Sequence, residues 1–373
     1  MRIAYLSSFY PLRGGIAQYN ASLKKAFEAR GCEVAAFTFS RQYPDLLFPG
    51  KSQYIEPGEE AEKVDSRAIL DTINPISWQR TASAIKAFKP DILFMKYWMS
   101  WFAPSLGTVA WQMPKETKVI SVLDNVLSHE KRPFDKTMSS WFLNKNDGFL
   151  VMSEKVKEDM LSLKSNAKYL FHPHPLYDHF GAPADPAMAR KKLGIETEKK
   201  VLLFFGFIRA YKGLDLLIEA MQFLDESYVL LAAGESYEDI QKYKSKIDSS
   251  AAKDRIILHD QYISDSETPN YFAASDACLL PYKSATQSGI ALIAYHFGLP
   301  IIATDVGGLK EYVKDGQTGV LVDQPTPEQI AEGIKRYFKL GGRKEFSAKM
   351  DAGKAEMSWD HLAGEILKFN DSL

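Results

Sequence analysis

The sequence predicts an α/β protein made of two consecutive units, each built around a parallel β-sheet. Short apolar runs alternate with longer amphipathic stretches along the chain, which is typical of β-α-β crossover units. A proline- and glycine-rich stretch at 172–186 interrupts this alternation, which then resumes. The length of 373 residues also exceeds that of one ordinary domain. We therefore predict domains at 1–178 and 179–355, followed by a C-terminal segment at 356–373.

Apolar runs of strand length define the expected sheets. In the first unit, strands are expected at 2–9, 33–39, 91–97, 118–123, 148–152 and 168–172. In the second unit, strands are expected at 200–207, 228–233, 255–258, 277–281, 300–304 and 319–322.

Amphipathic spacing predicts the helices between these strands. They are expected at 17–30, 82–88, 155–164, 214–224, 239–247, 268–274, 290–297, 309–314 and 327–338. A last helix at 359–369 can pack on either unit. The polar stretch 49–67 is expected to be a loop in the first unit.

Composition narrows the range of functions. Hydrophobic residues make up 46% and charged residues 25%, as in an ordinary globular protein. The net charge of −1 argues against a nucleic-acid partner, because phosphate binding normally shows as an excess of Lys and Arg. Cys32 and Cys278 lie far apart in apolar runs, which favours buried thiols in a reducing compartment. No apolar run is long enough to span a membrane.

Ligands of open parallel sheets bind beyond the carboxyl ends of the strands, so the loops that follow strands are informative. The first such loop carries Gly14 and Gly15 before a helix, where glycine lets a backbone approach an anion. A plain tight turn explains this pair equally well. Another loop carries Arg209 and Lys212, three residues apart, before a helix; they suit a diphosphate, although two solvated cations remain an alternative.

A third loop carries Thr286, Gln287, Ser288 and Gly289 at the start of an apolar helix. Small polar side chains at a helix N-terminus can bind hydroxyl groups or an anion. An ordinary capped helix start would have the same composition.

Together, these segments resemble the GT-B glycosyltransferases of family 4, a retaining group that uses nucleotide-sugar donors. The motifs are Gly14-Gly15, F-G-x-x-R-x-x-K-G at Phe205–Gly213, and G-x-P-I-I-A-T-D-V-G-G at Gly298–Gly308. Ser358-Trp359 resembles the start of the family's terminal helix, which crosses back to the first domain. The resemblance implies two Rossmann-like, doubly wound domains facing a cleft.

The resemblance also implies roles for individual residues. Arg209 and Lys212 would bind the donor diphosphate in the second domain. Gly14 and Gly15 would close over it from the first domain, which would hold the acceptor. The segment Thr286–Gly289 would complete the donor site.

One departure from the family concerns the two glutamates that usually lie eight positions apart before the G-x-P segment. No Asp or Glu lies between Tyr282 and Gly298, and Ile293 stands where the second glutamate usually holds the ribose. The T-Q-S-G run resembles a subgroup of the family. Asp124 stands at the position of the family's usual histidine in the first domain, and His129 follows closely, so both are candidates to contact the sugar or acceptor.

The expected activity is transfer of a sugar from a nucleotide-diphosphate sugar to a glycan or lipid-linked acceptor, as in polysaccharide biosynthesis. No cofactor or metal is expected, and the chain has no D-x-D pair. The expected location is cytoplasmic, with peripheral contact at the inner face of a membrane left open. A non-catalytic binding subunit is the alternative. A nicotinamide-dependent oxidoreductase is disfavoured because the G-x-G-x-x-G turn is absent.

Overall fold

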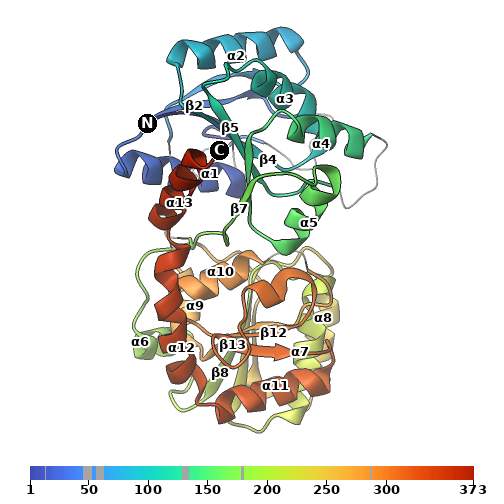
Figure 1. Cartoon of the computed structure of the whole chain (residues 1–373). Helices are drawn as coiled ribbons and strands as arrows, with labels where there is room; N and C mark the ends of the chain where they lie inside the picture. The colour runs from blue at the N-terminus through green and yellow to red at the C-terminus, as the bar shows by residue number, and fades with distance from the viewer. Residues whose placement is uncertain (13, 45–52, 56–62, 128–133, 178–179, 286–287) are drawn as a thin grey trace. The chain divides into compact units, whose positions relative to one another are not determined.

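The computed structural model divides the chain into two compact units, each with its own parallel sheet (Figure 1). It describes residues 1–373 except 13, 45–52, 56–62, 128–133, 178–179 and 286–287. Unit 1 comprises Met1–His174 and Ser358–Leu373, and unit 2 comprises Pro175–Met357.

Unit 1 contains a seven-stranded sheet in the order β3-β2-β1-β4-β5-β6-β7, in which every neighbouring pair is parallel. The strands are β1 (Arg2–Leu6), β2 (Glu33–Arg41), β3 (Ser66–Asp71), β4 (Ile92–Tyr97), β5 (Lys118–Leu123), β6 (Gly148–Val151) and β7 (Tyr169–Phe171). The helices are α1 (Gly15–Ala29), α2 (Pro75–Phe88), α3 (Ala103–Trp111), α4 (Asp135–Leu143), α5 (Glu154–Leu163) and α13 (Trp359–Asp371).

Both faces of this sheet are buried, which explains why its central strands read as continuous apolar runs. In β4, Leu93 and Met95 face one core while Ile92 and Phe94 face the other. Helices α2, α3, α4 and α5 cover the first face. Helix α1 and the last helix of the chain, α13, pack together over the second face (Figure 1).

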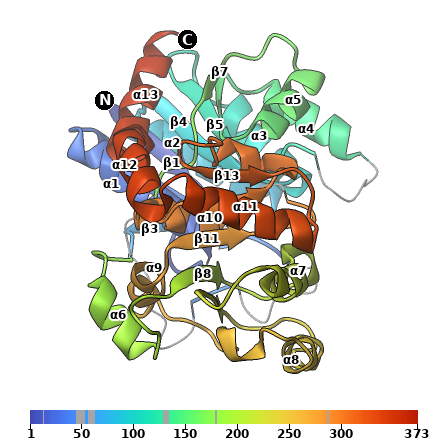
Figure 2. The same cartoon turned by 90° about the horizontal axis from the view of Figure 1, so that it is seen from below.

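Unit 2 contains a six-stranded parallel sheet in the order β10-β9-β8-β11-β12-β13. The strands are β8 (Lys200–Phe205), β9 (Tyr228–Ala233), β10 (Ile256–His259), β11 (Ala277–Leu280), β12 (Ile301–Thr304) and β13 (Gly319–Val322). The helices are α6 (Pro186–Lys192), α7 (Leu214–Ala220), α8 (Gln241–Asp248), α9 (Thr268–Ala274), α10 (Gly289–His296), α11 (Pro327–Lys339) and α12 (Gly342–Gly353). Helices α7, α8 and α11 contribute to one core, α9 and α10 to the other, and α12 to both through Phe346 and Met350 (Figure 2).

Helix starts follow the capping signals in the sequence. A side-chain oxygen accepts a hydrogen bond from a backbone N–H of the first turn and so satisfies a group that the helix itself leaves unpaired. The capping residues are Asn74, Ser153, Asp185, Ser288, Thr326 and Ser358.

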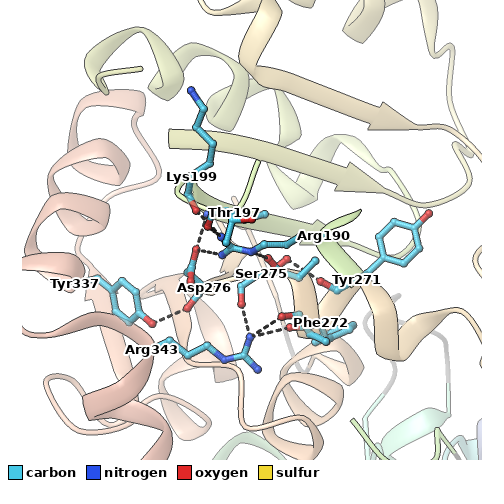
Figure 3. Close-up of polar contacts among 12 residues, drawn as sticks. Arg190, Thr197, Lys199, Tyr271, Phe272, Ser275, Asp276, Tyr337 and Arg343 are labelled. Atoms are coloured by element: carbon cyan, nitrogen blue, oxygen red, sulfur yellow. Dashed lines mark hydrogen bonds and ion pairs between the residues drawn. The ribbon is translucent and has the colours of Figure 1, made fainter. Parts of the chain in front are cut away.

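Two arginines anchor the amino edge of the unit 2 sheet (Figure 3). The carboxylate of Asp276, just before β11, accepts hydrogen bonds from Arg190 and from the backbone N–H of Val201. Arg343 of α12 donates to the carbonyls of Phe272, Ala273 and Ser275, at the end of α9. These contacts lie at the edge opposite the loops that were expected to bind ligand, so we assign them a structural role.

The strand pattern agrees with the sequence prediction, but several elements differ. β3 was not expected, and its first residues, Ser66 and Arg67, fall within the predicted loop 49–67. The predicted helix 309–314 is a short 3-10 segment at Gly307–Glu311. Helices α3, α4, α6 and α12 were also missed. Six of the nine residues of α3 are buried, so it lacks the polar stripe that marks an amphipathic helix.

Candidate functional site

The strand order of unit 2 reverses between β8 and β11, which are neighbours although far apart in sequence. Such a switch point leaves room for a ligand beyond the carboxyl ends of the two strands. The loop after β8 carries Arg209 and Lys212, and the loop after β11 leads to Ser288 and Gly289. The two expected donor-binding segments therefore flank the same position of the sheet. Thr286 and Gln287 lie outside the described residues.

Two glycines let the backbones approach closely at this edge. Gly213 has a φ of 73°, and a Cβ there would lie 2.1 Å from the carbonyl oxygen of Pro281. Gly234, after β9, has a φ of 152°, and a Cβ there would lie 2.1 Å from the carbonyl oxygen of Gly206. Any larger residue would push these loops apart. The close approach to Pro281 therefore explains why glycine follows the lysine of the K-G motif, at Gly213.

Lys212 is a buried cation at this edge, with only 7% of its surface exposed. Its ammonium makes no ion pair or hydrogen bond with any residue that the structure describes, and it lies 5.9 Å from the ring centroid of Tyr282. Burial, and then the charge of Arg209, lower the pKa of Lys212 to about 8. An anion bound here would supply the missing counter-charge.

Arg209 is exposed, and its guanidinium lies 4.9 Å from the ring centroid of Tyr237. Tyr237 in turn packs edge-on against Phe207 at 4.6 Å between ring centroids. The described residues provide no carboxylate partner for Arg209, so its donors remain available. The loop between the two cations is held by Glu238, which accepts a hydrogen bond from the backbone N–H of Ala210.

Ser288 caps α10 and accepts a hydrogen bond from the N–H of Ala291 at 3.4 Å. Its hydroxyl also lies 3.3 Å from the hydroxyl of Tyr282. Gly289 is the first residue of the helix. Ile293, at the position of the usual ribose-binding glutamate, is only 8% exposed and belongs to an apolar core. This position therefore offers no polar group to a ribose.

In unit 1 the strand order reverses between β1 and β4. The loop after β1 ends at Gly14 and Gly15; Gly14 has a φ of 107° and precedes the first turn of α1. A Cβ on either glycine would meet no described atom within 4 Å, so space alone does not require glycine here. The left-handed backbone of Gly14 does favour it.

Asp124 lies just after β5 and pairs with Lys96 of β4, whose Nζ is 2.7 Å from Asp124 Oδ1. Lys96 is 2% exposed, and its Nζ also lies 3.6 Å from the ring centroid of Tyr19. Burial lowers the pKa of Lys96, and the charge of Asp124 opposes this shift. The buried Tyr19 hydroxyl has no hydrogen-bond partner among the described residues. Sequence reasoning missed Lys96, although a lysine within an apolar strand is itself a signal.

Three histidines of the sequence, His129, His172 and His174, remain to be placed. His129, the second candidate near the reaction centre, lies outside the described residues. His172 packs against His361, and His174 packs against Tyr19 and Trp359. Within the described parts of the chain, no group of three His, Cys, Asp or Glu residues is placed to hold a metal ion.

Two family models match the chain and together span most of it. Residues 13–170 match Glycosyltransferase Family 4, and residues 185–356 match Glycosyl transferases group 1. Each model covers less than half of the chain, but both describe glycosyltransferases, and the chain is a glycosyltransferase. A similar relative, the D-inositol 3-phosphate glycosyltransferase of Xylanimonas cellulosilytica, is 24% identical over 95% of this chain and 90% of its own length.

Solved structures of glycosyltransferases share the fold of this enzyme. A glycosyltransferase from Rickettsia africae matches with a TM-score of 0.74 at 17% identity, over 99% of this chain and 98% of that one. HepE from Anabaena, solved with UDP, matches with a TM-score of 0.73 at 15% identity over the full length of both chains. The expected architecture of two Rossmann-like domains is thus confirmed. No described helix of this glycosyltransferase is long and apolar enough to cross a bilayer.

Proposed function

We propose that this glycosyltransferase moves a sugar from a nucleotide-diphosphate sugar to a glycan or lipid-linked acceptor, with retention of configuration and without a metal ion. Unit 2 binds the donor, and Arg209 and Lys212 hold the leaving diphosphate. The supporting observation is the unpaired, buried ammonium of Lys212 at the β8–β11 switch point. HepE, which shares the fold, was solved with UDP and with UDP-glucose, which supports a nucleotide-sugar donor.

The proposed chemistry follows from charge. When the bond between the sugar and the diphosphate breaks, the electron pair stays on the phosphate oxygen and the leaving group gains negative charge. A fixed cation that meets this charge stabilises the transition state more than the ground state. Lys212 provides a point charge in a partly desolvated position, and Arg209 provides a fork of donors to phosphate oxygens. The acceptor oxygen bonds to the sugar carbon on the face from which the diphosphate departs, which retains the configuration, and the proton of the acceptor hydroxyl passes to the departing phosphate oxygen.

Unit 1 binds the acceptor in this proposal, and Asp124 contacts the sugar or acceptor. The Lys96 ammonium fixes the position of the Asp124 carboxylate through their 2.7 Å contact. Gly14 and Gly15, at the start of α1, provide free backbone N–H groups for the donor phosphates. Thr286, Gln287, Ser288 and Gly289 are proposed to contact the donor in place of the missing glutamates, as in the T-Q-S-G subgroup. The ribose then relies on groups other than Ile293.

The test is release of nucleoside diphosphate from a panel of nucleotide sugars, with candidate acceptors present and EDTA in the buffer. We expect one donor to give turnover that EDTA does not reduce, and Arg209→Ala and Lys212→Met to lower it by two to three orders of magnitude or more. Turnover that strictly requires a divalent metal would contradict the metal-free proposal. Binding of a donor without any transfer would instead favour the non-catalytic subunit.

A further inference from the structure

The three consecutive helices α2, α3 and α4 form an unusual outer surface on unit 1. They contact one another in sequence order and cover the same face of the sheet (Figure 1). Helices α2 and α3 contain no acidic residue, and the one acid of α4, Asp135, is buried against Ser100. Their outer surface therefore presents no exposed carboxylate from these helices.

Large apolar side chains gather on this surface. Phe134, Met138 and Trp141 follow one another at spacings of four and three residues, so they lie on one side of α4. They are 73%, 39% and 38% exposed, and Trp111 at the end of α3 is 65% exposed. The Lys145 ammonium lies 5.8 Å from the ring centroids of both Trp111 and Trp141, so one cation contacts both indoles.

The position of Trp141 is built into the helix packing. A Cβ on Gly107 of α3 would lie 2.2 Å from the Trp141 ring, so only glycine there lets the indole lie across α3. The packing of α4 against α3 at Gly107 therefore fixes the position of the Trp141 side chain in the exposed apolar patch. Isolated exposed apolar residues need no explanation, but a contiguous aromatic patch does.

Cations on the same layer of helices lack acidic partners. Arg80 and Lys86 of α2, Lys136 of α4, and Lys145 form no ion pair with the residues that the structure describes. Helix α5, on the same face of the sheet, is different, because its lysines pair with acids of their own helix. The exposed cations of α2 and α4, unlike those of α5, therefore keep their charge uncompensated by a neighbouring acid.

We propose that this basic-aromatic face (Trp111, Phe134, Met138 and Trp141, with Arg80, Lys86, Lys136 and Lys145) docks unit 1 on an anionic membrane surface. Indole rings with a polar N–H and an apolar body partition into the headgroup region of a bilayer, and lysines attract anionic lipids. A second copy of the chain fits poorly, because a two-fold contact through this face would bring its own cations together.

The test is sedimentation of the full-length protein with vesicles of phosphatidylcholine alone or with added phosphatidylglycerol. We expect binding only to the anionic vesicles, loss of binding at high salt, and a blue shift of tryptophan fluorescence on binding. Lys136→Glu with Lys145→Glu should weaken partitioning by about thirtyfold or more, because each basic residue near such a surface contributes a factor of about five. Trp111→Ser with Phe134→Asn should weaken it by about tenfold or more.

Matched controls separate docking from general effects of charge and hydrophobicity. Lys253→Glu with Lys344→Glu changes two exposed lysines of unit 2, and Met188→Ser with Leu340→Ser changes two of its exposed apolar residues. We expect both to bind vesicles like the wild type. Wild-type protein that stays in the supernatant, or controls that lose as much binding as the test variants, would overturn the proposal. So would a dimer that Trp111→Ser with Phe134→Asn dissociates, without vesicle binding.

Discussion

At the residue scale, Lys212 links stability to binding. Its pKa of about 8 means that burial disfavours the charged form in the folded protein. Below that pH the ammonium is charged in both the folded and the unfolded chain, and the full burial cost applies. The cost disappears as the pH rises from about 8 towards the pKa of an unfolded lysine, because the folded protein releases its proton first.

We therefore expect Lys212→Met to raise the free energy of unfolding at neutral pH by roughly 1–3 kcal/mol while it abolishes diphosphate binding. Urea unfolding followed by circular dichroism measures the first effect. Lys212→Arg is the control, since it keeps the charge and should not gain stability. A destabilised Lys212→Met protein would show that the ammonium has a favourable partner in the fold.

The same pKa predicts how binding depends on pH. A bound diphosphate needs the charged form of Lys212, so its affinity should be constant below pH 8 and fall about tenfold for each further pH unit above it. In Lys212→Arg the affinity should stay level over the same range. Calorimetry with a nucleoside diphosphate from pH 7 to 10 provides the measurement, and a flat profile in the wild type would contradict a role for this ammonium.

Lys96 and Asp124 form the other residue-scale prediction. Removing one partner leaves a buried or half-buried charge without compensation, so Lys96→Met should cost roughly 2–4 kcal/mol of unfolding free energy. Adding Asp124→Asn removes the remaining charge and should restore part of that loss. Urea unfolding of the two single variants and the double variant tests the coupling. Additive losses would show that the two groups do not act as a pair.

At the element scale, Arg343 supports the end of α9. It donates to three backbone carbonyls there, and burial lowers the pKa of its guanidinium. Arg343→Met would leave these carbonyls unpaired, and we expect a loss of about 2–3 kcal/mol in thermal or urea unfolding, with unchanged diphosphate affinity. Arg336→Met is the matched control: its exposed pair with Asp315 should contribute less than about 1 kcal/mol. Equal losses in both variants would refute the capping role.

The sequence predicted elements well where periodicity and length were clear, and failed where tertiary packing decides. β3 spans only Ser66–Asp71 and follows a long polar stretch, so its short apolar core at Ile69 and Leu70 was overlooked. Helix α3 is apolar on nearly all sides, because α2, α4 and the sheet enclose it. The Gly307–Glu311 segment forms a 3-10 turn, since a glycine pair disfavours a regular helix start.

In the candidate site, too, the sequence predicted the residues that lie in motifs but not the contacts that depend on tertiary packing. The family motifs led to Arg209 and Lys212, and the topology then placed both beside the β8–β11 switch point. The pairing of Lys96 with Asp124 could not be predicted, because it depends on two neighbouring strands that are separated by a helix. A ribose partner cannot be inferred from the motif either, since Ile293 has replaced the usual glutamate.

At the scale of the whole molecule, the chain has two units with separate cores. Unit 1 depends on both ends of the chain, because Leu362 and Ile366 of α13 complete the core beneath α1. We therefore expect calorimetric unfolding to show two transitions, of which a nucleoside diphosphate raises the one that belongs to unit 2 more than the other, because unit 2 provides both cations. Leu362→Ala should lower the other transition by roughly 2–5 kcal/mol of unfolding free energy. A single transition that responds to both changes would contradict independent units.

The most direct test of the whole account is calorimetry of nucleoside diphosphate binding in EDTA. The wild type should bind without a metal ion, Arg209→Ala with Lys212→Met should show no heat of binding, and Lys253→Glu with Lys344→Glu should bind like the wild type. If the Arg209→Ala, Lys212→Met protein bound the diphosphate as tightly as the wild type, the proposal that these two side chains bind the leaving group would be wrong.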